Sequence, residues 1–199
     1  MQLQEVIIKG YKSISSDVPL HLTLKKINVI LGANGSGKSN IISFFKMLNY
    51  MMSGSLQSFI ESNGGSQSFL HYGSKKTQNI LASLIFKSSK FHDKYDFTLS
   101  YATPDKLIIT SEEAEYQNGK YSKPKKIKLE TDFKESVLSH KQEDRTLAVI
   151  KKILSNCKVY QFHDSSQTAA IRNSCPKDVD NYLQAEANNL AAFLLRIKN

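Results

Sequence analysis

The strongest constraint on the fold is a glycine-rich segment near the N-terminus. It reads Gly-Ala-Asn-Gly-Ser-Gly-Lys-Ser over residues 32–39, a complete GxxxxGK[ST] pattern. Residues 26–31 before it are a short apolar, β-branched run that predicts a buried strand, and residues 40–48 after it carry apolar side chains at helical spacing. A strand, a glycine turn and a helix in this order place backbone N–H groups and a helix N-terminus where an anion would bind. The segment therefore predicts a site for the phosphates of a nucleotide.

The residues of this loop have distinct expected roles. Gly37 lets the backbone approach a phosphate that a Cβ would obstruct. Lys38 is expected to reach the β- and γ-phosphates as a binding and catalytic residue, and Ser39 to place its hydroxyl on Mg²⁺. A purely structural glycine turn is the alternative, and the flanking elements argue against it. The residues predicted here to bind ATP with Mg²⁺ are Asn34, Gly35, Ser36, Gly37, Lys38, Ser39 and Asn40.

Composition sets the class of protein. With 199 residues, 40% hydrophobic and 23% charged, the chain is long enough for one globular domain with a sizeable core. It has no apolar run near the ~20 residues that span a bilayer and no signal-peptide pattern, so a cytoplasmic protein without a membrane partner is expected. Cys157 and Cys175 show neither metal-ligand spacing nor a disulfide framework. The net charge of +9 leaves open a nucleic-acid surface or an evenly solvated lysine surface.

The rest of the chain predicts a mixed α/β fold in which an antiparallel sheet lies beside the glycine-loop strand. Further strands are predicted over residues 3–9, 18–24, 79–88, 94–101, 106–111, 125–129 and 157–162. Helices are predicted over residues 40–50, 146–156 and 181–198, with short helical pieces at 56–60 and 69–72. A GTPase-type switch is set aside because the sequence has no NKxD segment for guanine.

Three segments resemble a known family. Residues 3–14, the glycine loop and residues 160–170 (YQFHDSSQTAA) are similar to the N-terminal half of ABC-type ATPases of the RecF/SMC-like, AAA-type group, and residues 172–194 continue the likeness. The resemblance implies a P-loop NTPase fold and an ATPase head that sandwiches ATP between two copies, hence a homodimer. It also implies a setting in DNA repair, chromosome maintenance or phage defence, with DNA and a nuclease or defence protein as candidate partners.

The resemblance assigns residues outside the loop as well. Lys12 matches a basic residue that approaches a phosphate or the adenine, although an ordinary solvated lysine is the alternative. Gln161 matches a catalytic Q-loop glutamine that would sense Mg²⁺ and the attacking water, against a polar residue on the exposed face of a strand. His163 and Asp164 form a polar pair whose stronger interpretation is a turn cap, and Arg172 needs no functional role.

Two departures from the family pattern limit the expected activity. Residues 185–188 read Ala-Glu-Ala-Asn, where an Asp-Gly pair is common. Neither an LSxG-like signature nor an apolar strand ending in Asp-Glu occurs between residues 1 and 199, and Glu112-Glu113 is the nearest approach. We therefore expect residues 1–199 to be the N-terminal portion of an ATPase domain that binds ATP without turning it over. The alternative is a non-catalytic nucleotide-binding or protein-interaction module.

Overall fold

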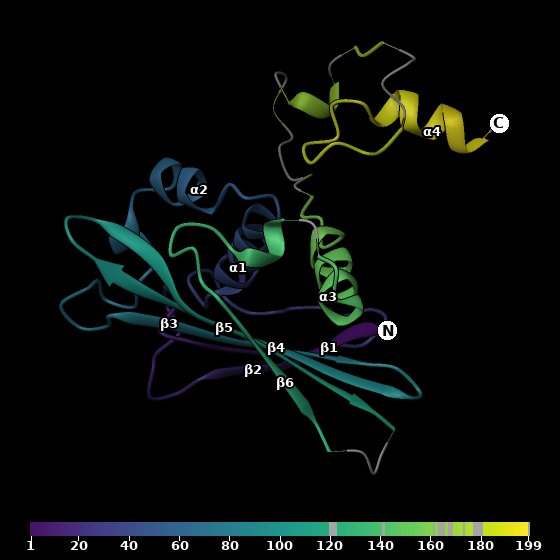
Figure 1. Cartoon of the computed structure of the whole chain (residues 1–199). Helices are drawn as coiled ribbons and strands as arrows, with labels where there is room; N and C mark the ends of the chain where they lie inside the picture. Colours follow the sequence, from purple (N-terminus) through teal and green to yellow (C-terminus); the bar gives the residue numbers. More distant parts are fainter. Residues whose placement is uncertain are drawn as a thin grey trace. The chain divides into compact units, whose positions relative to one another are not determined.

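The structure is a computed structural model. It describes residues 1–119, 123–140, 142–160, 162, 166, 169–172, 174–176 and 181–198. The chain divides into two compact units, Met1–Cys157 and Lys158–Asn199, and each is treated by itself (Figure 1). None of the helices in the described residues combines the length and the apolar character needed to cross a membrane.

The first unit is built on a six-stranded sheet with the order β2-β1-β3-β4-β5-β6. Every neighbouring pair of strands is antiparallel. The strands are β1 (Gln2–Lys9), β2 (Leu20–Thr23), β3 (Asn79–Lys87), β4 (Phe91–Ala102), β5 (Lys106–Asn118) and β6 (Lys125–Leu129). Short turns join β3 to β4 and β4 to β5, so the centre of the sheet forms from residues that are close in sequence. The predicted mixed α/β fold with an antiparallel sheet is confirmed.

Helices cover one face of this sheet (Figure 1). They are α1 (Lys38–Met52), α2 (Leu56–Ser62) and α3 (Arg145–Ser155), which confirm the predicted helices in these regions. Side chains alternate along each strand, so the strands bury every second residue beneath the helices. Phe44 of α1, for example, stacks on Phe97 of β4 with 6.4 Å between ring centroids. The hydrophobic core therefore lies between the sheet and the three helices.

The predicted strand in front of the glycine loop is wrong. Residues 26–31, all of which the structure describes, form no strand, and Ile27, Val29 and Leu31 are 84%, 76% and 87% exposed. A strand needs a neighbour for its backbone N–H and C=O groups, and no described strand pairs with this segment. The antiparallel sheet forms as predicted, but no strand from residues 26–31 lies next to it, and β2 occupies the edge beside β1.

The second unit contains a short 3₁₀ turn, η3 (Ala170–Arg172), and the helix α4 (Leu190–Lys198). The predicted helix start at residue 181 is wrong because the Asn189 side chain bonds the preceding backbone. Its Oδ1 accepts from the N–H of Gln184 at 2.9 Å, and its Nδ2 donates to the carbonyl of Tyr182 at 2.8 Å. Such bonds compete with helix formation. Ala187 lies in this turn with φ 57°, a left-handed conformation that glycine adopts without the steric cost. The predicted strand at 157–162 is also absent from its described residues.

Candidate nucleotide-binding site

The glycine loop ends where α1 begins. Gly37 is the N-cap residue with φ 90°, and no described side chain caps the helix. The N–H of Asn40 donates to the Gly37 carbonyl at 3.0 Å, and the first turn of α1 contains no acidic residue. The first N–H groups of a helix lack acceptors within the helix and carry the positive end of its dipole. This terminus therefore favours an anion.

The Lys38 ammonium bridges the two ends of the loop. Its Nζ donates to the carbonyls of Gly32 and Ala33 at 2.6 and 2.7 Å and lies 3.4 Å from Ser36 Oγ. The N–H of Ser36 donates to the Ala33 carbonyl at 3.2 Å, which closes a tight turn. The loop is thus ordered around one cation, and that cation is held by neutral carbonyls that an anion could replace.

The outer side of the loop is open. Residues 32–36 and Ser39 are exposed, whereas Gly37, Lys38 and Asn40 are partly buried. Gly35 has φ 83°, and a Cβ built there meets no atom within 4 Å. The structure therefore brings the loop residues named in the sequence together at one helix end, with the Ser39 hydroxyl exposed for a ligand.

A turn that follows β1 supports the loop from the side. The Nδ2 of Asn40 donates to Ser13 Oγ at 2.7 Å, and a Cβ on Gly37 would lie 2.8 Å from the same oxygen. Lys12 Nζ donates to Ser43 Oγ at 3.0 Å, about one helical turn after Ser39. Sequence reasoning missed the Ser13 contacts because they join residues that are far apart in the chain.

The surroundings of Lys12 are less polar than those of a surface lysine. Its Nζ lies 5.0 Å from the centre of the Phe69 ring, and burial lowers the pKa of the Lys12 ammonium. The neighbouring Tyr11 is buried and its hydroxyl lies 3.0 Å from Ser43 Oγ. Burial is also the main cause of the raised pKa of Tyr11. Lys12 is therefore a structured cation beside the first turns of α1 rather than a freely solvated one.

The residues that the resemblance assigns further along the chain are not all described. Gln161, His163 and Asp164 lie outside the described residues, so the catalytic and metal-binding role of Gln161 stays a prediction. Arg172 is exposed at the end of η3. Among the described residues, no three His, Cys, Asp or Glu side chains gather in a way that could hold a metal ion.

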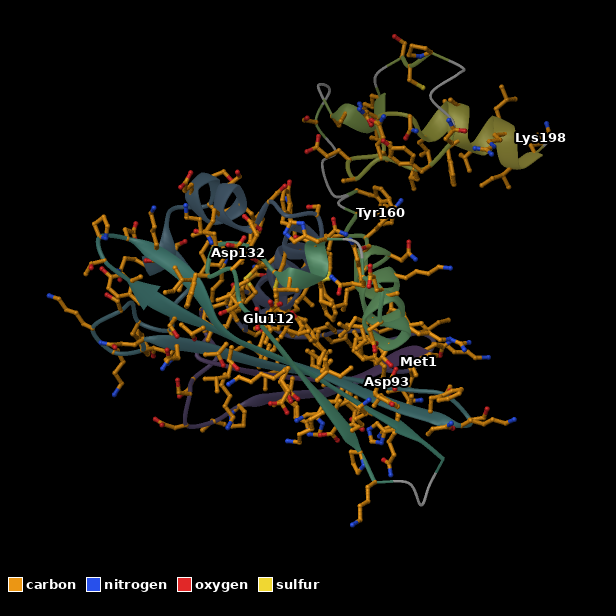
Figure 2. The ribbon with its side chains drawn as sticks, viewed as in Figure 1. Met1, Asp93, Glu112, Asp132, Tyr160 and Lys198 are labelled. Carbon is orange, nitrogen blue, oxygen red and sulfur yellow. The ribbon has the colours of Figure 1, made fainter. Side chains whose placement is uncertain are left out.

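The acidic residues 112 and 113 point to opposite faces of the sheet, one into the core and one to the surface. Glu112 is 1% exposed in the middle of β5, where its carboxylate accepts from the Tyr95 hydroxyl, the Ser136 hydroxyl and the Val137 N–H. In Figure 2 it lies between the sheet and the helices. Glu113 points to the other face and pairs with Lys126 at 3.2 Å. Both carboxylates thus have partners within the protein, and both lie in the middle of β5 rather than at its end.

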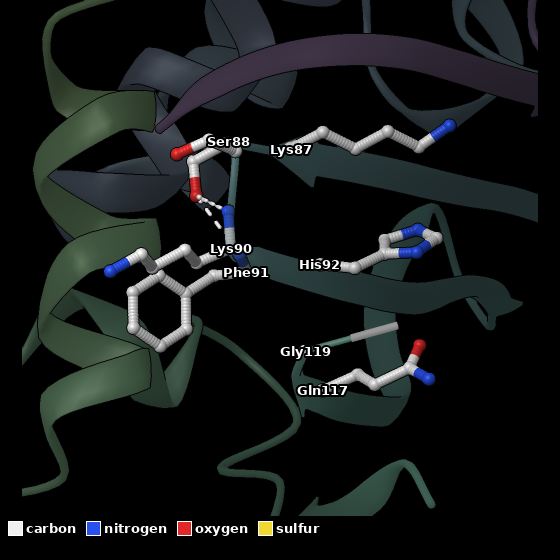
Figure 3. A pocket seen from close by; sticks show the side chains of 8 residues that line it. Lys87, Ser88, Lys90, Phe91, His92, Gln117 and Gly119 are labelled. Atoms are coloured by element: carbon white, nitrogen blue, oxygen red, sulfur yellow. Dashed lines mark hydrogen bonds between the residues drawn. The ribbon is translucent and has the colours of Figure 1, made fainter. Parts of the chain in front are cut away.

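A hollow of about 400 Å³ lies at the turn between β3 and β4. It is lined by Lys87, Ser88, Ser89, Lys90, Phe91, His92, Gln117 and Gly119. Figure 3 shows Lys90 and Phe91 extending to one side and Lys87 and His92 to the other, so the basic groups do not converge on one point. Because Gln2 of β1 pairs with Lys87, the hollow is at the opposite end of β1 from the turn that supports the glycine loop.

The Ser13 contact yields a prediction about the loop. Gly37→Ala should weaken ATP binding more than Gly35→Ala does, and the difference between the two variants should be about 1 kcal/mol, roughly fivefold in affinity. Both glycines have left-handed backbones, with φ 90° and 83°, but only at Gly37 would the Cβ displace the hydroxyl that Asn40 bonds. Calorimetric titration compares the two variants. In a Ser13→Ala background they should behave alike, and equal losses in the parent background would contradict the contact.

Comparison with known proteins places the chain in a family. Residues 5–198 match the family of AAA domains. Over 53 residues, 27% of this chain, it is 42% identical to Structural maintenance of chromosomes protein 3 of Arabidopsis thaliana, and this match spans 4% of that protein.

One solved structure, from work described as "Structural biochemistry of ATP-driven dimerization and DNA stimulated activation of SMC ATPases", aligns with 99% of this chain and 96% of its own. The identity is 14% and the TM-score 0.41, values at which the likeness supports no conclusion about this chain. The family match confirms the predicted AAA-type relationship. Because it extends from residue 5 to residue 198, the chain belongs to the family of AAA domains.

Proposed function

We propose that this chain is the N-terminal portion of an SMC/RecF-like ATPase head and that it binds ATP with Mg²⁺. The observation that carries the proposal is the glycine loop at the N-terminus of α1, where a lysine ammonium and uncapped helix N–H groups meet in a chain of the AAA-domain family. A helix terminus alone attracts many anions. The Lys38 cation, the Ser39 hydroxyl beside it and the two left-handed glycines favour the polyphosphate of a nucleotide.

The loop residues would divide the work of binding. Lys38 would exchange the carbonyls of Gly32 and Ala33 for the β- and γ-phosphate oxygens, which are stronger acceptors because they are charged. The backbone N–H groups of residues 34, 35 and 37 would line the phosphates, and Ser39 would offer its exposed hydroxyl to Mg²⁺. The ion would neutralise charge on the phosphates. Lys12, held over Ser43, would add a second cation at the same helix end.

Catalysis is proposed to be incomplete in residues 1–199. Phosphoryl transfer requires a positioned water and charge stabilisation around the γ-phosphate. The sequence holds no apolar strand ending in Asp-Glu, and Glu112, the nearest candidate, is committed to three interior hydrogen bonds. The second candidate function, a nucleotide-binding or interaction module without turnover, is favoured by the same observation.

Binding and turnover can be measured on one sample. We expect calorimetric titration of the full chain with ATP and Mg²⁺ to show binding, and a phosphate-release assay to show no more turnover than Lys38→Ala. Turnover approaching ~1 per second, as in working enzymes, would contradict the half-site proposal. An absence of binding heat, with an unaltered circular dichroism spectrum, would instead contradict the proposed nucleotide site.

The wider setting follows from the family and the charge. We propose a cytoplasmic protein that pairs as a homodimer through its ATP-bound heads, in DNA repair, chromosome maintenance or phage defence. The net charge of +9 supports contact with DNA, since lysine ammonium groups gain affinity for phosphates by releasing counterions. A nuclease or defence partner is a hypothesis that rests on the sequence resemblance alone.

A further inference from the structure

One aromatic side chain has no role in the fold described above. Tyr72 is 81% exposed, more than any other tyrosine or phenylalanine among the described residues. Its backbone is left-handed with φ 55°, a conformation that costs a bulky residue energy and persists only where neighbouring contacts hold it. A small polar residue would adopt the same left-handed backbone in this exposed turn at a lower conformational energy. Tyr72 is therefore a candidate for a surface that meets a ligand.

Backbone and side-chain bonds fix the position of this tyrosine. The His71 N–H donates to the Gly10 carbonyl at 3.1 Å, and His71 Nδ1 donates to the Lys12 carbonyl at 2.7 Å. Leu70 pairs with Tyr11 in an isolated antiparallel bridge, so the predicted helical piece at 69–72 is wrong. The His71 ring then meets the Tyr72 ring edge-on, with 4.3 Å between centroids. The aromatic face is thus presented beside a residue that is hydrogen-bonded to the turn of residues 10–13.

The turn that holds Tyr72 is the turn that supports the glycine loop. Residues 10–13 bond His71 through the carbonyls of Gly10 and Lys12, and bond α1 through the side chains of Lys12 and Ser13. We infer that a ligand whose phosphates lie at the N-terminus of α1 extends its other end toward this turn. In a nucleotide that other end is a flat aromatic base.

We propose that Tyr72 is the stacking platform for the base of the nucleotide. This inference rests on the proposed function, because it takes the phosphates to lie in the glycine loop. Base–aromatic stacking tolerates any base, since every base has a π-face. The site should therefore add affinity for nucleotides over inorganic polyphosphates, with little choice between adenine and guanine.

The test compares ligands with and without a base. Tyr72→Ala should bind ATP and GTP about 5- to 100-fold more weakly in the presence of Mg²⁺, while its affinity for inorganic tripolyphosphate stays unchanged. Tyr72→Phe should keep the affinity of the parent chain for all three ligands. Phe133→Ala is the matched control, because Phe133 is 55% exposed with φ 60° in another loop and should leave all three affinities unchanged.

The outcomes separate this inference from the nucleotide site itself. If Tyr72→Ala binds ATP as tightly as the parent while Lys38→Ala does not, the stacking platform is wrong and the phosphate loop stands. If Tyr72→Ala loses ATP and tripolyphosphate equally, the tyrosine supports the loop rather than a base, which also overturns the inference. If the parent chain binds neither ligand, the proposed function fails and the inference fails with it.

Discussion

Replacing Lys38 with alanine should weaken the binding of ATP by about 2–4 kcal/mol, roughly 30- to 1,000-fold. The ammonium is the one side-chain cation that bonds the glycine loop in the described structure, at 2.6 and 2.7 Å from the carbonyls of Gly32 and Ala33. These neutral acceptors would give way to charged phosphate oxygens on binding, so the variant loses contacts that are strong because both partners are ionised. Calorimetric titration with ATP and Mg²⁺ measures the difference.

The matched control for this variant is Lys46→Ala. Lys46 lies on the same helix and is exposed, so its removal changes the net charge equally without touching the loop. It should leave the affinity for ATP within about twofold of the parent, because a distant surface charge is screened by salt. Equal affinities for Lys38→Ala and the parent would show that the loop does not hold the phosphates. A large loss in Lys46→Ala would show that general electrostatic attraction, rather than the loop, drives binding.

The local part of this site could be predicted from sequence, and its supporting contacts could not. The pattern Gly-x-x-x-x-Gly-Lys-Ser fixes its own turn through positive φ at Gly37 and a lysine that folds back on the loop. The bonds from Ser13 to Asn40 and from Lys12 to Ser43 join residues 27 and 31 positions apart. No periodicity records such pairings, because they depend on how the sheet and the helix meet. The exposed position of Tyr72 could not be predicted for the same reason, since its turn depends on the bridge between Tyr11 and Leu70.

The strands also show that features set by local sequence could be predicted, whereas features that depend on distant residues could not. The hairpins of β3, β4 and β5 were predictable because alternating apolar residues and short turns are both local. The run at residues 26–31 has the same apolar character, yet it forms no strand within the part of the chain that the structure describes. Strand formation needs a partner with the right register, and a sequence pattern does not supply one. The buried carboxylate of Glu112 was unexpected because a charge in a strand usually marks its exposed face.

Replacing Glu112 with alanine should lower the free energy of unfolding by about 3 kcal/mol. The carboxylate accepts from the Tyr95 hydroxyl, from Ser136 Oγ at 2.5 Å and from the Val137 N–H at 3.0 Å. Burial raises the pKa of Tyr95 well above its usual value, so its hydroxyl stays a donor that must find an acceptor at neutral pH. Alanine would leave these interior donors without their acceptor and would open a cavity beside the sheet. Urea denaturation followed by far-ultraviolet circular dichroism measures the loss.

The neighbouring residue supplies the control for that loss. Glu113 is on the same strand but faces the other side of the sheet, where its pair with Lys126 at 3.2 Å is open to solvent. Glu113→Ala should therefore cost about 0–1 kcal/mol, since exposed ion pairs are screened by water. Glu112→Gln should fall between the two, because the amide keeps the shape and one acceptor oxygen but gives up the charge. Equal stabilities for the two alanine variants would mean that the buried network contributes nothing beyond a surface charge, and that β5 is held by its ladder and its apolar residues alone.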